Sequence, residues 1–343
     1  MRFADKENIT GSRGPLLTQT ERRGTSSGKP RTRVGFLYQV YGLTIKSEIE
    51  LPELVPVTAR KHDVRIQFGK VPETLESIIE KWPWCIASAD EFLFNIDGVA
   101  KYHIAGGEKI TIERRLGLEG SVPGADIRLW LLGTALAALL HQRSLLPLHV
   151  SAIRAPGGTW AFTGESGEGK STLAGFLHRR FGHDLISDDV SVINPQNTDP
   201  VIYPGPRKLK LWADALEYLE FKGCIKVRDL SNTDKFQLYL DADAGYRIGC
   251  LGCLDGLVLL ESVPEDEDAT IERLHGIEAF NIAFRAIYRP YMNKWFRKPE
   301  KLMLEVAALC GKVSIYRFCR PRSLANFEKN LEPLLKLIKA GDK

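Results

Sequence analysis

The stretch Gly164–Ser171, G-E-S-G-E-G-K-S, decides how the rest of the chain is interpreted. Its spacing (Gly, four residues, Gly-Lys and then Ser) is that of loops that bind the phosphates of a nucleotide. Glycines have no Cβ, so this backbone can take positive φ angles and approach a polyphosphate closely. Lys170 is then expected to reach the β- and γ-phosphates, and the Ser171 hydroxyl to contact Mg²⁺. The predicted nucleotide contacts are Gly164, Glu165, Ser166, Gly167, Glu168, Gly169, Lys170, Ser171 and Thr172.

The sequence on either side of this stretch fits the motif. Thr159–Thr163 is short, apolar and rich in strand-forming residues, which predicts a buried strand entering the loop. From Thr172 to Arg180 apolar residues recur at helical spacing, and Gly182 is suited to ending a helix. Strand, loop and helix are the context that the motif requires, and this context disfavours a chance glycine-rich loop.

Composition indicates a globular protein of one large domain with additions, or of two domains. The chain has 343 residues, of which 44% are hydrophobic and 26% charged, and its net charge of +4 does not by itself indicate nucleic acid. We expect no signal peptide, because the N-terminus has no apolar h-region. The most apolar run, Leu129–Leu140, is too short to cross a bilayer and predicts a buried helix. The C-x-x-C pair Cys250 and Cys253 has no second pair at zinc-site spacing, so reduced cysteines in the cytoplasm are expected.

Composition and hydrophobic pattern divide the chain into four regions. Residues 1–32 are rich in Arg, Lys, Gly, Ser and Thr, which predicts a disordered basic tail. Residues 33–125 contain short alternating segments, which predict a β-rich accessory domain. Residues 126–265 hold the glycine-rich loop and are predicted to form the core. Residues 266–343 are predicted to be helical with one strand, and to pack on that core.

Two segments outside the loop carry groups suited to chemistry. Leu145–Ile153 is predicted to be a strand that brings His149 near the loop, although a lone histidine is more often structural. His183–Ile193 is predicted to be an apolar strand with adjacent acids, Asp188 and Asp189. Since neighbouring strand residues point to opposite faces, one carboxylate could face Mg²⁺ and the other an acceptor hydroxyl. A solvated pair of turn acids is the alternative.

A basic segment follows the acid pair. Arg207, Lys208 and Lys210 could hold a phosphate or an acidic peptide, and a solvated basic edge strand is an equally good interpretation. Lys235, just before a further predicted strand, is a weaker candidate for a phosphate contact.

Together, these elements resemble the C-terminal catalytic domain of HPr kinase/phosphorylase. That family has a G-x-S-G-x-G-K-S loop, which Gly164–Ser171 matches, and a preceding histidine, which His149 matches. Its R-G-H-x-L-x-x-D-D segment is similar to Phe181–Asp189 except at the first position. The resemblance covers residues 145–195 well and the rest weakly. It implies an α/β fold: a P-loop kinase core of HPr-kinase/PEP-carboxykinase type with a mixed sheet, preceded by a β-rich N-terminal region.

The resemblance also implies an activity, that of a serine kinase using ATP and Mg²⁺. Asp189 would be the general base for the acceptor hydroxyl, and His149 would assist at the phosphoryl group. Asp188 and Ser171 would lie on the metal side, and the roles of the two aspartates could be exchanged. The implied catalytic residues are therefore His149, Lys170, Asp188 and Asp189.

Two departures from the family bear on the metal site and on the acceptor. The I-E-x-R-G segment, whose Glu binds metal in the family, has no clear counterpart near Pro204–Leu211. The N-terminal region looks like that of short HPr-kinase-like proteins encoded with ribosomal-peptide pathways, some of which resemble lasso-peptide precursor kinases. The expected acceptor is therefore a serine of a peptide or small protein, with no nucleic-acid or membrane partner and with a homo-oligomer left open.

Other functions stay open at this point. A regulatory module could bind a nucleotide without transferring phosphate, and a metabolite kinase could use the same loop. A P-loop ATPase or GTPase is disfavoured, because the chain has no N-K-x-D segment for base recognition and the acids follow the loop too closely.

Overall fold

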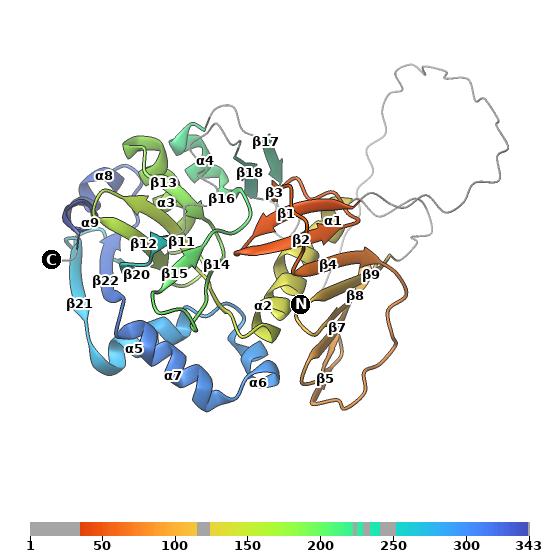
Figure 1. Cartoon of the computed structure of the whole chain (residues 1–343). Helices are drawn as coiled ribbons and strands as arrows, with labels where there is room; N and C mark the ends of the chain where they lie inside the picture. The colour runs from red at the N-terminus through yellow and green to blue at the C-terminus, as the bar shows by residue number, and fades with distance from the viewer. Residues whose placement is uncertain (1–34, 115–123, 222–224, 229–233, 241–251, 342–343) are drawn as a thin grey trace, which may run out of the picture. The chain divides into compact units, whose positions relative to one another are not determined.

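The computed structural model describes residues 35–114, 124–221, 225–228, 234–240 and 252–341 (Figure 1). The predicted tail at 1–32 and Cys250 lie outside this part of the chain. The described residues form a mixed α/β fold with four sheets, of which two contain both parallel and antiparallel pairs. Among them no helix has both the length and the apolar character needed to cross a membrane.

The N-terminal sheet accounts for all the strands before residue 115 that the structure describes. Its nine strands run in the order β3-β1-β2-β4-β9-β8-β7-β6-β5. Alternating residues along them are buried, as in β8, where Tyr102 and Ile104 face the core. The bounds are β1 Phe36–Val40, β2 Leu43–Ser47, β3 Val55–Pro56, β4 Val64–Phe68, β5 Glu80–Trp82, β6 Cys85–Ala87, β7 Glu91–Ile96, β8 Ala100–Ala105 and β9 Lys109–Arg114.

A nearly uninterrupted helical run covers the buried face of this sheet. It consists of α1 (Gly124–Trp130), the π-helical turn η1 (Leu131–Ala135) and α2 (Leu136–Gln142). Its apolar residues share one core cluster with the strands, and the Tyr102 hydroxyl donates a hydrogen bond to the Ile127 carbonyl over 3.1 Å. The predicted buried helix is therefore confirmed.

The central sheet has six strands in the order β13-β11-β12-β20-β22-β21. The pairs β12–β20 and β20–β22 are parallel and the other three are antiparallel. β12 leads through the glycine-rich stretch into α3, so the predicted order of strand, loop and helix is confirmed. The bounds are β11 Ser151–Ala155, β12 Gly158–Thr163, α3 Lys170–Phe181, β13 Asp184–Ser187, β20 Gly256–Val263, β21 Thr270–Leu274 and β22 Ser314–Pro321.

Two smaller sheets complete the strands. One has the order β10-β14-β15-β19 and the other β16-β18-β17. The prediction of a single strand at Leu145–Ile153 is wrong. The strand is interrupted at His149 and Val150, and the two parts, β10 and β11, belong to different sheets. The bounds are β10 Leu146–Leu148, β14 Ser191–Ile193, β15 Val201–Tyr203, β19 Gly252–Cys253, β16 Lys208–Trp212, α4 Ala213–Leu219, β17 Ile225–Arg228 and β18 Lys235–Tyr239.

The C-terminal part is helical around two strands rather than the predicted one. Thr270–Leu274 was expected to belong to the helical part, but it pairs antiparallel with β22 as β21. Two short helices end the described chain: α8 ends at Asn330, and α9 begins at Glu332 with Pro333 in its first turn. The bounds are α5 Gly276–Arg285, η3 Pro290–Met292, α6 Asn293–Phe296, α7 Pro299–Cys310, α8 Phe327–Asn330 and α9 Glu332–Ala340.

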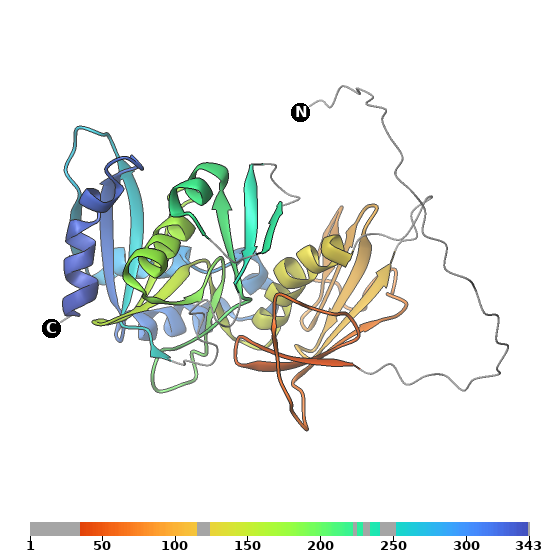
Figure 2. The same cartoon turned by 90° about the horizontal axis from the view of Figure 1, so that it is seen from above.

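The segment around α3 and the C-terminal helices share one apolar core. Leu173 and Leu177 of α3 and Leu334 and Ile338 of α9 belong to the same buried cluster. Figure 2 shows the blue C-terminal helices and strands beside the green segment that contains β12 and α3. The loop at the end of β12 is therefore held between well-packed elements, while the predicted domain boundaries at 125–126 and 265–266 stay predictions.

Candidate functional site

The glycine loop (Gly164–Gly169) joins β12 to α3 in a conformation that its glycines make possible. The φ angles are 144° at Gly164, 99° at Gly167 and 79° at Gly169, which side chains with a Cβ rarely adopt. A Cβ on Gly164 would also lie 2.7 Å from the carbonyl oxygen of Leu260 on β20. The local sequence is therefore required both for the turn and for its close approach to the neighbouring strand.

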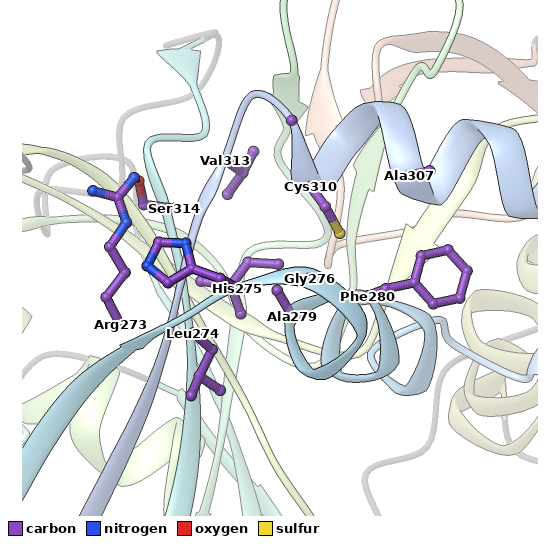
Figure 3. Close-up of a pocket in the computed structure, with 12 residues that line it drawn as sticks. Arg273, Leu274, His275, Gly276, Ala279, Phe280, Ala307, Cys310, Val313 and Ser314 are labelled. Carbon is purple, nitrogen blue, oxygen red and sulfur yellow. The ribbon is translucent and has the colours of Figure 1, made fainter.

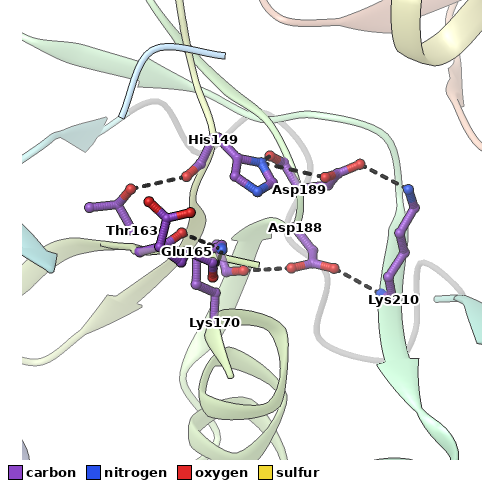
Figure 4. Close-up of polar contacts among 9 residues, drawn as sticks. His149, Thr163, Glu165, Lys170, Asp188, Asp189 and Lys210 are labelled. Carbon is purple, nitrogen blue, oxygen red and sulfur yellow. Dashed lines mark hydrogen bonds and ion pairs between the residues drawn. The ribbon is translucent and has the colours of Figure 1, made fainter. Parts of the chain in front are cut away.

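Lys170, the first residue of α3, folds back over this loop. Its side chain is buried, and Nζ donates hydrogen bonds to the carbonyls of Gly164 (2.7 Å) and Glu165 (3.0 Å), as Figure 4 shows in part. Burial lowers the pKa of Lys170, and the carboxylates of Asp188 and Asp189 oppose this effect. No side-chain hydrogen bond caps α3 at Gly169, so the first N–H groups of a twelve-residue helix face the same space as this ammonium group.

A cavity of about 210 Å³ lies at this helix end. It is lined by all four predicted catalytic residues, which come from the β10–β11 link, from α3 and from the β13–β14 link. Of the nine predicted nucleotide contacts, six line it, and Lys170 is one of them. The lining residues are His149, Ser151, Ser166, Gly167, Gly169, Lys170, Ser171, Thr172, Asp188, Asp189, Lys210, Trp212 and Lys235.

A larger cavity of about 720 Å³ adjoins the first one on the other side of the glycine loop. The two share His149 and Ser166. Three predicted nucleotide contacts, Gly164, Glu165 and Glu168, line this second cavity rather than the first, together with β20 and the end of α5. The predicted set of contacts is thus divided between two adjoining spaces.

A third cavity, of about 310 Å³, shares no lining residue with the other two, and Figure 3 shows the residues that line it. It is formed by the end of β21, the start of α5 and the end of α7. The guanidinium of Arg273 at its edge donates to the Ser314 hydroxyl over 2.9 Å. None of the residues that the sequence analysis selected lines this cavity.

Asp188 is a buried junction between three segments, with 1% of its surface exposed. Its Oδ1 accepts a hydrogen bond from the Ser151 hydroxyl on β11 (2.5 Å). Its Oδ2 accepts one from the backbone N–H of Lys210 on β16 (2.8 Å), as Figure 4 shows. The carboxylate therefore ties the acid-bearing turn to both neighbouring strands.

Asp189 faces the same cavity but has different partners. Its Oδ2 lies 3.0 Å from Lys210 Nζ, and its backbone carbonyl accepts a hydrogen bond from His149 Nδ1 over 2.9 Å. Burial alone would raise the pKa of Asp189, but the charges of Lys210, Lys208 and His149 outweigh it and lower that pKa. The carboxylate is therefore ionised at neutral pH.

The acid pair does not lie on a strand, so the predicted arrangement is wrong. Asp188 and Asp189 form the bend between β13 and β14, and Asp189 has a φ of 76°. This left-handed backbone cannot continue a strand, although aspartate tolerates it better than most residues. The turn, rather than strand alternation, directs both side chains into one cavity.

His149 occupies the break between β10 and β11. A carbonyl can only accept a hydrogen bond, so the contact with Asp189 places the ring proton on Nδ1 and leaves Nε2 as an acceptor. Burial lowers the pKa of His149, which favours the neutral ring at pH 7. The backbone is held by hydrogen bonds from the Thr163 hydroxyl and to the Ala286 carbonyl.

The basic segment contributes to the site in a way that the sequence did not indicate. Lys208 is only 7% exposed, and Lys210 pairs with Asp189, so a solvated edge strand is the wrong interpretation for both. The guanidinium of Arg207 points elsewhere and donates to the Leu54 carbonyl. Ser151 and Trp212 were not predicted at all; for Ser151 the available signal was its position two residues after His149.

The donor set fits a metal ion that arrives with a ligand better than a resident one. Among the described residues, no group of three or more His, Cys, Asp or Glu side chains could hold a metal ion. Ser171 and Asp188, the predicted metal ligands, line the same cavity. Mg²⁺ typically uses one or two carboxylates, waters and substrate phosphates, and the two aspartates of this cavity match the protein part of such a set.

Comparison with known proteins gives a weak result. No family model matches the chain, and no curated protein matches it. Among solved structures, it is similar to the HPr(Ser) kinase/phosphatase from Coxiella burnetii, with 12% sequence identity and a TM-score of 0.26. The match covers 55% of this chain and 90% of that chain, and a likeness of this size supports no inference about function.

Proposed function

We propose that the protein is an ATP- and Mg²⁺-dependent serine kinase that transfers the γ-phosphate to a serine hydroxyl of a peptide or small protein. The observation that carries this proposal is the meeting of His149, Lys170, Asp188 and Asp189 in one cavity. Phosphoryl transfer depends mainly on positioning and on neutralising charge, and this cavity contains groups suited to both. A cytoplasmic location is part of the same proposal.

The glycine loop and the start of α3 serve the donor side. When bound, ATP and Mg²⁺ supply the phosphoryl group and the metal's positive charge. Lys170 exchanges its hydrogen bonds to the Gly164 and Glu165 carbonyls for phosphate oxygens. The N–H groups of the loop and the first turn bind the remaining oxygens. Ser171, which lines the same cavity, would supply its hydroxyl as a metal ligand.

Asp189 and His149 serve the acceptor side. Lys210 holds the Asp189 carboxylate ionised, so it can accept a hydrogen bond, and then the proton, from a serine hydroxyl. The Nε2 atom of His149 carries no proton in the neutral ring and can orient the same hydroxyl or contact the phosphoryl group once protonated. Asp188 positions this turn through its two hydrogen bonds and lies on the metal side.

The test is transfer of label from γ-labelled ATP with Mg²⁺ to serine-containing peptides, including ribosomal precursor peptides of the lasso type. We expect labelled phosphoserine with the parent, and a loss of at least a hundredfold with Asp189→Asn or Lys170→Met. Glu217→Gln, on the exposed side of α4, is the matched control and should leave the rate unchanged. Equal labelling by Asp189→Asn would remove the assignment of the base.

The same experiment separates the two alternative functions. A regulatory module would bind ATP in a manner that depends on Lys170 but would label no peptide. A small-metabolite kinase would place the label in a low-molecular-weight fraction. The peptide acceptor rests on the family resemblance of the sequence, so the metabolite fraction is analysed in every assay.

A further inference from the structure

Lys235 and Trp212 form one wall of the site cavity. They are paired residues on the antiparallel strands β18 and β16, and both line the cavity together with Ser171 and Thr172. The ammonium of Lys235 lies 5.4 Å from the centre of the Trp212 ring, a cation–π arrangement. Trp212 itself is 37% exposed, which is unusual for so large an apolar ring.

The three lysines that line the cavity differ in their partners. Lys170 donates to two loop carbonyls, and Lys210 is neutralised by Asp189. For Lys235, by contrast, the described part of the chain shows a ring contact and no ion pair with a carboxylate. The cavity is therefore lined by a cation that forms no ion pair with a carboxylate of the described residues.

The charge of Lys235 affects Lys170, which lines the same cavity. Burial is the main effect that lowers the pKa of Lys170 and nearby carboxylates oppose it, but the charge of Lys235 also contributes to the lowering. The two ammonium groups line one cavity and repel each other. A polyanion bound between them would attract both, so it would offset this repulsion.

The lining of the cavity indicates what kind of ligand this cation meets. In a loop of this kind Lys170 reaches the β- and γ-phosphates, and the Ser171 hydroxyl contacts Mg²⁺. Lys235 lines the same cavity as these two residues. We propose that Lys235 binds a phosphate group of a nucleoside triphosphate, and that Trp212 is a positioning residue that holds its ammonium group. This inference rests on the proposed function, because it assumes a nucleotide in the cavity.

Calorimetric titration with ATP and with inorganic triphosphate, each with Mg²⁺, tests this assignment. Lys235→Met should weaken both ligands by the same factor, about 10- to 100-fold, as expected for a lost hydrogen bond to a charged group. Lys235→Arg should restore most of the affinity, and Trp212→Leu should weaken both ligands less than Lys235→Met does. Lys109→Met, at the exposed first position of β9, is the control and should bind like the parent.

The outcomes distinguish this inference from the proposed function. If the parent binds no ATP, both fail. If the parent binds ATP and Lys170→Met does not, while Lys235→Met binds like the parent, only the Lys235 assignment is overturned. A loss of ATP affinity in Lys235→Met without a loss of triphosphate affinity would also overturn it, since the contact would then be to the nucleoside. The thermal unfolding midpoint of each variant is the control: a midpoint equal to that of the parent assigns a loss of affinity to the lost contact and not to unfolding.

Discussion

Replacing Asp188 with alanine should destabilise the fold by several kilocalories per mole, whether or not a ligand is bound. The carboxylate is buried and accepts hydrogen bonds from the Ser151 hydroxyl and the Lys210 N–H. Alanine removes the acceptor and leaves the buried Ser151 hydroxyl and the Lys210 N–H without this partner. A buried donor that loses its partner costs about 1–3 kcal/mol, so we expect a loss of about 2–6 kcal/mol.

Two further variants divide this loss between the partners. Asp188→Asn keeps one acceptor oxygen but turns an amide NH₂ towards the other donor, so about 1–3 kcal/mol should be lost. Ser151→Ala removes a hydrogen bond to a charged group and should cost about 1.5–3 kcal/mol. In the Ser151→Ala background, Asp188→Ala should cost less than it does in the parent, because the two residues share one interaction.

Urea unfolding of the parent and these variants measures the effect as a change in midpoint at constant m-value. Asp266→Ala, in an exposed turn, is the control and should lie within about 0.5 kcal/mol of the parent. If Asp188→Ala behaves like that control, or if the double-mutant cycle gives no coupling with Ser151, the carboxylate is not the junction described here.

Three other predictions concern neighbouring parts of the molecule. Gly256→Ala would place a Cβ 2.2 Å from the ring of the fully buried Trp160, so it should cost about 1–3 kcal/mol or more, measured by urea unfolding. Arg320→Met should weaken ATP binding about tenfold in a titration, because the buried guanidinium donates to the Glu168 carbonyl over 3.1 Å and supports the glycine loop; unchanged affinity would contradict this. Burial, assisted by Lys210, lowers the pKa of Lys208 from 10.5 to about 8, so between these pH values the unfolded chain binds a proton that the folded chain does not. Stability should therefore rise by on the order of 3 kcal/mol from pH 8 to pH 10.5, and Lys208→Met should abolish this part of the rise and stabilise the protein at pH 7; a pH profile identical to that of the parent would contradict it.

The sequence was most informative where a structure is determined by residues close together in the chain. Gly164, Gly167 and Gly169 indicate their own backbone angles, and the flanking apolar patterns indicate β12 and α3. The helical run at 124–142 could be predicted because Leu129–Leu140 is a nearly continuous apolar run that is too short to cross a bilayer.

The sequence was least informative about contacts between distant segments. Nothing near Lys210 in the chain indicates that its ammonium pairs with Asp189, because the pairing depends on how β16 packs beside the β13–β14 turn. The left-handed backbone at Asp189 was also missed, since an apolar sequence around two acids suggests a strand. The division of the loop contacts between two cavities depends on β20 and α5, which lie far along the chain.

The most direct test of the central claim is a crystal structure with a non-hydrolysable ATP analogue and Mg²⁺. We predict that the triphosphate lies along the glycine loop, with its terminal phosphate bonded to Lys170 and facing Asp189 and His149 at a distance that leaves room for one hydroxyl group. A nucleotide bound in another cavity, or a terminal phosphate directed away from both Asp189 and His149, would contradict the claim that this site transfers a phosphoryl group.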